Sequence, residues 1–193
     1  MYRAEKRPLL ISWRPSVKEM GATVNDSCYS VDELRMITIE YLADYPEFLP
    51  TLADWQHGEW GYIRPGDTVE ARMARLQASI GRDCIPLTMV ALADGKVLGS
   101  ASLIRHDMDT RLELTPWLAG VFVAPEHRRQ GIGPQLVRRI MAEAGKLNVP
   151  VLYLYTVHSE AFYANLGWSL LEHTAYRNQK VAIMTYQPTH ESR

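Results

Sequence analysis

APEHRRQGIGPQL, residues 124–136, is the stretch that decides how this sequence is interpreted. It follows an alternating apolar run, LAGVFV, and leads into LVRRIMAEAGKL, whose apolar residues recur at helical spacing. A strand that turns into a helix through glycines exposes unpaired backbone N–H groups at the helix N-terminus, where the partial positive charge favours an anion. The stretch therefore predicts a phosphate-binding loop.

Two glycines and two arginines define the chemistry of this loop. Gly131 and Gly133 lack Cβ atoms, so the backbone can turn sharply and approach a phosphate closely. Arg128 and Arg129 add forked, permanently charged donors at the rim. A single phosphate would need fewer donors, so the loop suits a diphosphate.

Three phosphate-binding patterns compete for the loop. The P-loop pattern GxxxxGK[ST] has no match in the chain. The dinucleotide pattern GxGxxG fails at Leu136, where the third glycine or alanine belongs, and the preceding strand comes late in the chain, after a hairpin. The third pattern is V-x-V-x-P-x-x-R-x-x-G-x-G, matched by Val121, Val123, Pro125, Arg128, Gly131 and Gly133.

A second motif, FYANLGW, begins at Phe162, 29 residues after Gly133 and beyond an intervening strand. In this order the two motifs resemble the GNAT superfamily of acyl-CoA-dependent N-acetyltransferases, whose acyl-CoA loop reads R/Q-x-x-G-x-G/A and whose second signature reads F-Y-x-x-L-G-F/W/Y. The resemblance covers about residues 36–187 and is most specific over 118–168. The alternative, a helix-capping glycine turn with core aromatic residues, would have to explain both motifs and their order.

The resemblance implies a fold and a co-substrate. The fold is α/β (α+β): a mixed, mostly antiparallel twisted sheet with a splayed central parallel pair of strands and flanking helices. Acetyl-CoA is the implied co-substrate, without a metal, and its pantetheine arm is expected between the splayed strands. The residues implied for its binding are Val121, Phe122, Val123, Arg128, Arg129, Gln130, Gly131, Ile132, Gly133, Pro134, Tyr163 and Asn165.

The implied reaction is attack of a neutral primary amine on the thioester. Tyr163 matches the tyrosine with which this family protonates the departing thiolate, and its alternative role is that of a core aromatic residue. Glu113 is our candidate for the general base, and the alternatives are Asp107, Asp109 and His158.

Aromatic residues mark the expected entrance for the amine. Trp117 and Asp109 are assigned to it as substrate-lining residues. Trp55, Trp60 and Tyr62 lie in a second stretch, residues 44–68, that is expected to contribute to it. None of these residues identifies the acceptor amine. A small molecule, a protein N-terminus, a lysine and an aminoglycoside are all compatible with the sequence.

Composition limits the class of protein. The 193 residues are 47% hydrophobic with a formal net charge of −1, which indicates one folded domain without a global attraction to nucleic acid or to an anionic membrane. The two cysteines form no CxxC pattern, which favours a cytoplasmic location, and the six histidines show no metal-binding spacing. Residues 1–35 lack clear periodicity and are interpreted as an N-terminal extension, either ordered and packed on the domain or a disordered or spurious leader, while 36–190 form the expected acetyltransferase domain. The oligomeric state, including a homodimer, is left open.

The remaining elements follow from periodicity and turn signals. We expect an opening strand near residue 38, a helix interrupted at Pro50, and a helix after Thr68, its N-cap. Asp94-Gly95 indicates a hairpin, and residues 149–157 a buried strand. Ser159 is the expected N-cap of the short helix that carries Tyr163, and two strands with a turn near Asn178 close the chain.

Two functions of other classes remain as alternatives to the acetyltransferase. One is a catalytically silent acyl-CoA-binding regulator on the same fold, which the presence of Tyr163 and of an intact loop disfavours. The other is an enzyme that binds a nucleotide or a phosphosugar through the glycine loop. Binding of CoA compared with ATP and NAD separates the second from the main interpretation.

Overall fold

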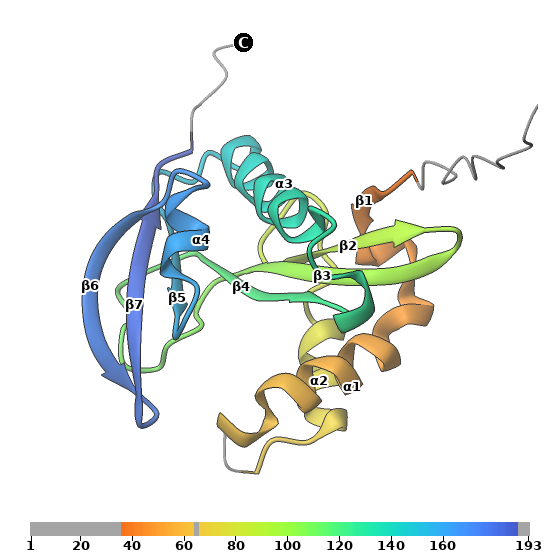
Figure 1. Cartoon of the computed structure of the whole chain (residues 1–193), viewed down its shortest axis with the longest axis horizontal. Coiled ribbons are helices and arrows are strands. Elements are labelled where there is room, and N and C mark those ends of the chain that lie inside the picture. Colours follow the sequence, from red (N-terminus) through yellow and green to blue (C-terminus); the bar gives the residue numbers. More distant parts are fainter. Residues whose placement is uncertain (1–35, 64–65, 189–193) are drawn as a thin grey trace, which may run out of the picture. The chain divides into compact units, whose positions relative to one another are not determined.

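Within the residues that it describes, 36–63 and 66–188, the computed structural model contains one sheet with helices on both of its faces (Figure 1). Our interpretation of residues 1–35 lies outside this range. The strands and helices are β1 (Thr38–Tyr41), α1 (Leu49–Trp60), α2 (Val69–Gln77), β2 (Leu87–Ala93), β3 (Lys96–Ile104), β4 (Trp117–Val123), α3 (Ile132–Lys146), β5 (Leu152–Thr156), α4 (Glu160–Ala164), β6 (Ser169–Tyr176) and β7 (Gln179–Tyr186).

The sheet is mixed and mostly antiparallel, as the resemblance implies. Its seven strands follow the order β1-β2-β3-β4-β5-β7-β6. Every neighbouring pair is antiparallel except the central pair β4 and β5. The expected fold class is therefore confirmed.

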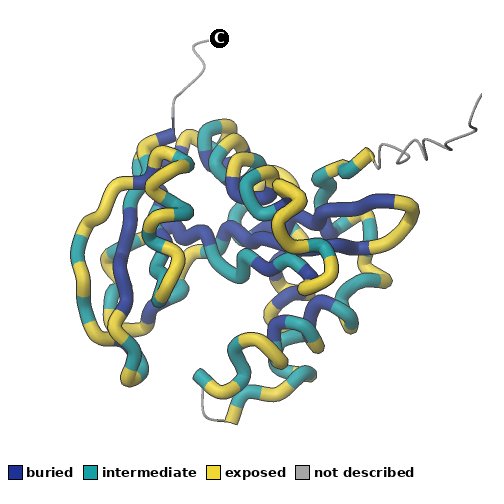
Figure 2. The backbone as a smooth tube through the Cα atoms, viewed as in Figure 1, coloured by how far each residue is buried: buried dark blue, intermediate teal, exposed yellow. Residues whose placement is uncertain are grey.

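Two apolar layers hold the helices on opposite faces of the sheet. Leu136, Val137 and Ile140 of α3 are fully buried against strand residues such as Leu98 and Leu103. On the other face, α1 and α2 pack on β2 and β3 through the buried cluster of Leu42, Leu52, Ala53, Leu76, Val90, Leu92 and Val97. Burial is continuous along β2 and most of β3, whereas the edge strand β6 is largely exposed (Figure 2).

Capping and turn residues in the sequence predicted most of the helix and hairpin boundaries correctly. The Thr68 hydroxyl accepts a hydrogen bond from the Ala71 N–H at 3.1 Å, as expected of an N-cap. Asp94 and Gly95 form the hairpin turn, both with positive φ, and Arg177 and Asn178 form the turn between β6 and β7 in the same way.

Three local predictions need correction. Pro50 does not interrupt a helix: α1 begins at Leu49, and Pro50 lies in its first turn, where a missing N–H costs no hydrogen bond. Ser159 occupies the N-cap position of α4 without a side-chain capping bond, and its N–H instead donates to the Thr156 hydroxyl at 3.0 Å. Strand β5 is only half buried, since Leu152 and Leu154 point into the core and its other residues do not.

The parallel pair β4–β5 separates almost as soon as it forms. Its register holds at Trp117 and Tyr153, where the Tyr153 N–H donates to the Pro116 carbonyl at 3.0 Å. Beyond this point β4 continues to Val123 without pairing to β5, which is the predicted splay. The sheet therefore opens in its centre, and both strands present unpaired backbone groups to the gap.

Among the described residues, no helix combines the length and the apolar character needed to cross a membrane.

Candidate active site

The predicted phosphate loop joins β4 to α3 through two left-handed residues. After Val123 the chain forms a short 3-10 turn, Pro125–His127, and Arg129 and Gly131 then adopt φ values of 64° and 76°. Positive φ carries no steric cost at glycine, which explains Gly131 as the residue immediately before α3. At Arg129 the same conformation is uncommon for an L-residue with a long side chain.

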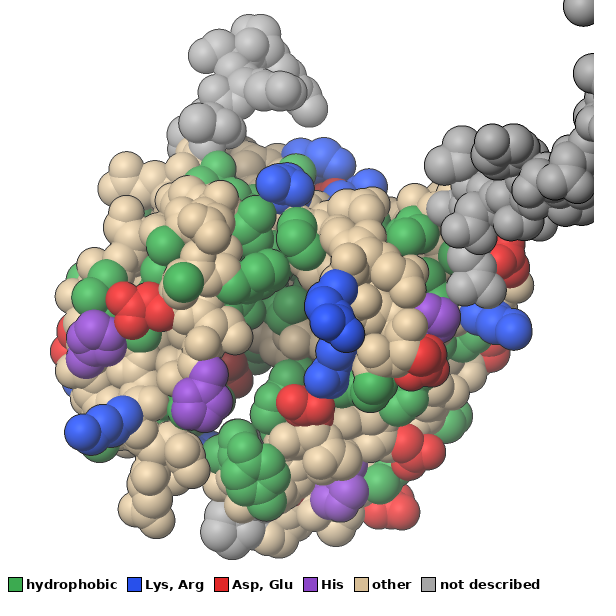
Figure 3. Space-filling model, viewed as in Figure 1, with side chains coloured by type: hydrophobic (Ala, Val, Ile, Leu, Met, Phe, Trp, Pro, Cys, Tyr) green, Lys and Arg blue, Asp and Glu red, His purple; other side chains and the backbone are tan. Residues whose placement is uncertain are grey.

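A cavity of about 350 Å³ lies at this loop. A Cβ added at Gly131 would meet no atom within 4 Å, so the backbone there faces open space. Figure 3 shows the face that carries α3 and α4, which is hollowed, with hydrophobic side chains in the hollow and basic side chains at its edge. The cavity is lined by Val123, His127, Arg128, Arg129, Gly131, Ile132, Gly133, Pro134 and Phe162.

The two arginines of the loop have different surroundings. Arg128 donates from Nε to the Val123 carbonyl at 3.0 Å and from Nη2 to Glu59 at 3.2 Å, and its guanidinium lies 5.7 Å from the centre of the Phe122 ring. Arg129 is exposed and makes no hydrogen bond or ion pair with the described part of the chain. Arg128 therefore fastens the loop to β4 and α1, and Arg129 is the cation left available to a ligand.

Gln130 and Pro134 complete the loop. The Gln130 side chain donates to the Glu126 carbonyl at 3.3 Å, which closes the turn on itself. Pro134 lies in the first turn of α3, where it removes no helical hydrogen bond. A Cβ on Gly133 would come within 3.6 Å of Phe162, so the first turn of α3 and the FYANLGW segment are in contact distance of each other.

The three residues at the end of β4 face alternate sides of the sheet. Phe122 packs on Trp55 and Trp60 of α1, with ring centres 5.4 and 6.1 Å apart. Val121 and Val123 pack instead on the core that lies under α3 and includes Phe162 and Tyr163. Their backbone therefore lines the gap, while their side chains hold β4 between two helical layers.

Tyr163 lies on α4 at the edge of the same core. Its ring makes edge-on contacts with Phe162 at 4.9 Å and with Trp168 at 6.2 Å between ring centres. Burial raises the pKa of Tyr163 to about 12, so the phenol is protonated at neutral pH. Its hydroxyl makes no hydrogen bond with the described residues, and Asn165, just past the helix, is exposed.

The residues predicted to bind the acceptor amine, Asp109, Glu113 and Trp117, have different surroundings and do not form one site. Asp109 pairs with Arg177 at 3.2 Å, and Arg111 pairs with Glu172 at 2.9 Å, so the 105–116 loop is fastened to the β6–β7 hairpin. Glu113 lies in that loop and is exposed, and its role as a base stays a prediction.

The assignment of Trp117 to an entrance is wrong. Its side chain is 0% exposed, and its indole N–H donates to the Leu114 carbonyl at 2.6 Å. The ring packs against Tyr153 and Tyr155 in the cluster beneath the β6–β7 hairpin. Trp117 therefore supports the start of β4 from inside, because the paired end of the parallel strands leaves no opening there.

The sequence analysis did not identify two residues of α1 that lie near β4, Gln56 and Glu59. Both lie on the side of α1 that meets β4: Glu59 holds Arg128, and Gln56 is buried beside Gly120. A signal was present, because a glutamine one turn after the buried Leu52 stands at a core position of the helix. Trp55 and Trp60, by contrast, were expected near the site.

A second cavity, about 500 Å³, lies over the β6–β7 hairpin beside the start of α4. Its lining includes Lys180 and the hydrogen-bonded side chains of His173 and Glu160, 2.9 Å apart. It includes none of the residues predicted for co-substrate binding, so the glycine-loop cavity is the candidate site.

Comparison with known proteins supports the same family. Residues 86–170 match the family model described as acetyltransferase (GNAT) domain. No curated protein sequence matches the chain. Among solved structures, an aminoglycoside 6'-N-acetyltransferase complexed with coenzyme A is similar with a TM-score of 0.63 at 15% identity, over 82% of this chain and 99% of that one.

Two further structures show the same fold. The Salmonella typhimurium protein yncA, solved with its cofactor acetyl-CoA, gives a TM-score of 0.60 at 18% identity, over 82% of this chain and 97% of that one. The ribosomal-protein-S18-alanine N-acetyltransferase from Escherichia coli gives 0.56 at 20% identity, over 81% and 97%. With the splayed strands and the glycine loop, residues 86–170 are similar to a GNAT acetyltransferase domain, and the described chain has the fold of these acetyltransferases.

Proposed function

We propose that this protein is an N-acetyltransferase that transfers the acetyl group of acetyl-CoA to a primary amine. The proposal rests on Val123, where the gap in the sheet meets the glycine-loop cavity. This residue ends the unpaired part of β4 and also lines the glycine-loop cavity, so one elongated ligand can occupy both. Acetyl-CoA has that form: a diphosphate, then a peptide-like pantetheine arm, then the thioester.

The residues at the cavity fit a diphosphate. The backbone from Gly131 to Gly133 opens a helix of 15 residues, whose N-terminus favours negative charge. Gly131 leaves the space above it free, and Arg129 adds an exposed cation. Arg128 contributes indirectly, by holding the loop in place through Val123 and Glu59.

The gap in the sheet fits the pantetheine arm. The arm carries amide groups, which can pair with the free backbone groups of Val121, Phe122 and Val123 as a further strand would. Backbone N–H groups on this edge can also donate to the thioester oxygen as negative charge develops there.

In the proposed reaction Tyr163 donates a proton to the sulfur, and a base or water accepts a proton from the amine. The amine nitrogen forms a bond to the acetyl carbon and loses a proton to a base, the carbon–sulfur bond breaks, and the phenol of Tyr163 gives its proton to the departing sulfur and is then reprotonated from solvent. A lysine amine, with a pKa of about 10.4, is neutral in only about one molecule in 2,500 at pH 7, whereas an α-amine is neutral in roughly one in seven. A base is therefore more valuable for lysine, and Glu113 or water supplies it in this proposal.

The presence of a protonated Tyr163 favours an enzyme over a silent binding protein, because a regulator has no use for a proton donor in this position. We place the acetyltransferase domain at residues 36–190, which contain the glycine loop, the splayed strands and α4.

The test is release of CoA thiol from acetyl-CoA in the presence of primary amines. A panel should contain phenethylamine, spermidine, kanamycin and a short peptide with a free α-amine, with buffer alone as the control. We expect at least one amine to raise thiol release well above the buffer rate and to gain an acetyl group by mass spectrometry. Tight binding of acetyl-CoA without release by any amine would support the silent regulator instead.

A further inference from the structure

The second cavity, about 500 Å³ over the β6–β7 hairpin, shares no residue with the glycine-loop cavity. The strand register explains its form. His173 lies opposite Ala182 and Ala175 lies opposite Lys180, so these residues share one face of the hairpin. The two alanines are short, and they leave space between the longer side chains of His173 and Lys180. The pairing of β6 with β7 therefore builds a hollow with a small-residue floor and a polar rim.

Helix α4 separates the two cavities. Glu160, its first residue, lines the second cavity, whereas Phe162 lines the glycine-loop cavity. Tyr163 follows Glu160 by three residues, a spacing that places two side chains on the same face of a helix. Val157, just beyond the end of β5, also lines the second cavity. The second cavity thus begins at the end of β5 where the gap is open, one helical turn from the proposed proton donor.

The order of the strands gives the distance between the gap and the second cavity. The hairpin lies beside β5 on the side away from β4, with β7 next to β5 and β6 at the edge (Figure 1). Neighbouring strands are about 4.8 Å apart, so the centre of the cavity lies roughly 10 Å from the gap. A small monoamine is too short to occupy both places. An extended peptide advances about 3.3 Å per residue, so its third or fourth residue reaches the cavity.

Lys180 brings an unpaired charge to this cavity. The Glu160 carboxylate is bonded to His173, with Oε2 2.9 Å from Nε2. Lys180 is exposed and makes no hydrogen bond or ion pair with any residue that the structure describes. Two other charged residues of the hairpin are paired with the 105–116 loop. A carboxylate is therefore attracted to the cavity, whereas a polycation such as a polyamine or an aminoglycoside is repelled by Lys180.

We propose that the acceptor is the N-terminus of a peptide, and that the second cavity binds a carboxylate side chain of its third or fourth residue. This inference rests on the proposed acetyl transfer. The α-amine lies in the gap beside the thioester, the extended backbone passes β5, and Lys180 pairs with the carboxylate. An α-amine also needs the least help from a base, because roughly one in seven is neutral at pH 7.

The experiment compares three acceptors that share an N-terminal alanine. They are alaninamide and two alanine-based hexapeptide amides, one with glutamate and the other with glutamine at positions three and four. We expect the parent to show a kcat/KM about fivefold higher for the glutamate peptide, the upper range for an exposed ion pair. High salt should reduce this preference, because it screens exposed charges.

Three variants test the charge and the space separately. Lys180→Gln should abolish the preference for glutamate and leave the kinetics with alaninamide and the melting temperature at the parent level. Lys96→Gln, at an exposed lysine that begins β3, is the matched control and should keep the preference. Ala175→Leu fills the floor of the cavity, so it should raise KM for both peptides severalfold without changing KM for alaninamide.

The outcomes separate this inference from the proposed function. A parent that releases no thiol with any amine would overturn both. Acetyl transfer with equal kcat/KM for the two peptides would overturn the peptide inference alone. A preference for glutamate that survives in Lys180→Gln would also overturn it, as would an equal loss of preference in Lys180→Gln and Lys96→Gln, which would indicate an effect of net charge.

Discussion

Tyr163 is the residue on which the proposed chemistry depends most. It lies against Phe162 and Trp168, and its burial raises its pKa to about 12. A raised pKa keeps the proton on the phenol over the whole working range of an enzyme. The surroundings that bury the ring therefore also preserve it as a donor to the sulfur.

Tyr163→Phe should lower kcat by roughly tenfold to a hundredfold, the lower end of general acid catalysis, because a thiol is already a fair leaving group. The ring remains, so the melting temperature and the affinity for acetyl-CoA should stay close to those of the parent. Because the pKa is raised, parent kcat should show no loss attributable to Tyr163 between pH 7 and 10. Tyr45→Phe, on the α1 side of the sheet, is the control. An unchanged kcat in folded Tyr163→Phe would leave water or His158 as the proton source.

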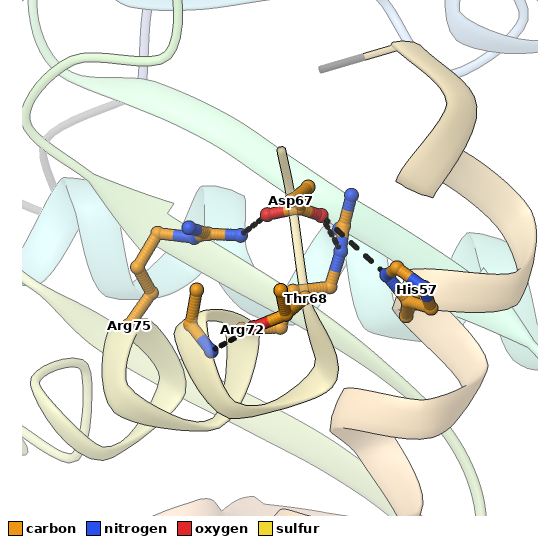
Figure 4. Close-up of polar contacts among 6 residues, drawn as sticks. His57, Asp67, Thr68, Arg72 and Arg75 are labelled. Atoms are coloured by element: carbon orange, nitrogen blue, oxygen red, sulfur yellow. Dashed lines mark hydrogen bonds and ion pairs between the residues drawn. The ribbon is translucent and has the colours of Figure 1, made fainter. Parts of the chain in front are cut away.

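At the scale of elements, a single carboxylate organises the charged side chains at the start of α2. Asp67 lies just before α2 with its side chain shielded from solvent, and it forms ion pairs with Arg72 and Arg75, with His57 of α1 3.8 Å away (Figure 4). Burial by itself would raise the pKa of Asp67, but the hydrogen bond from Arg75 and the charges of both arginines outweigh it, and the pKa is lowered. Through His57, this cluster lies against α1, the helix that carries Gln56 and Glu59.

Asp67→Asn should lower the free energy of unfolding by roughly 1–2 kcal/mol at pH 7, since it removes charge-assisted hydrogen bonds to partly exposed arginines. The lowered pKa means that the parent holds this stabilisation above about pH 4 and loses it as the pH falls through the native value. Urea unfolding at pH 7 and at pH 3 measures the difference. The exposed Asp54→Asn on α1 is the control and should match the parent at both values. A gap between parent and Asp67→Asn that stayed constant down to pH 3 would contradict the ionic explanation.

Much of the fold could be predicted from patterns that are local in the chain. Asp94-Gly95, Thr68 and the GxG loop each specify their own backbone, so their positions follow from a few neighbouring residues. Pro50 was misinterpreted because the sequence alone does not distinguish a proline in the first turn of a helix from a proline that interrupts a helix. The interruption was placed where the helix in fact begins.

Pairings between distant residues could not be predicted in the same way. Trp117 was assigned to an entrance because its burial depends on Tyr153 and Tyr155, which lie more than thirty residues later. Arg128 stays a predicted phosphate ligand, and its contact with Glu59 could not be predicted because it depends on how α1 packs. For the whole molecule, the glycine loop predicted the fold, whereas the arrangement of the acceptor side depends on tertiary contacts that no short motif indicates.

The central claim for the whole molecule is that the glycine loop and the gap in the sheet bind acetyl-CoA together. Calorimetric titration of acetyl-CoA into the parent, Gly131→Val and Gly95→Val tests it most directly. Both glycines have positive φ, 76° and 70°, and open space at the Cβ position, so both substitutions carry a similar backbone strain, about 1–2 kcal/mol. Only Gly131 lines the cavity, so only its side chain would occupy the place of the diphosphate.

We expect tight binding by the parent and by Gly95→Val, and binding weakened at least tenfold in Gly131→Val, with comparable melting temperatures for the two variants. Equal affinity of all three proteins for acetyl-CoA would contradict the account, since it would place the diphosphate away from the loop.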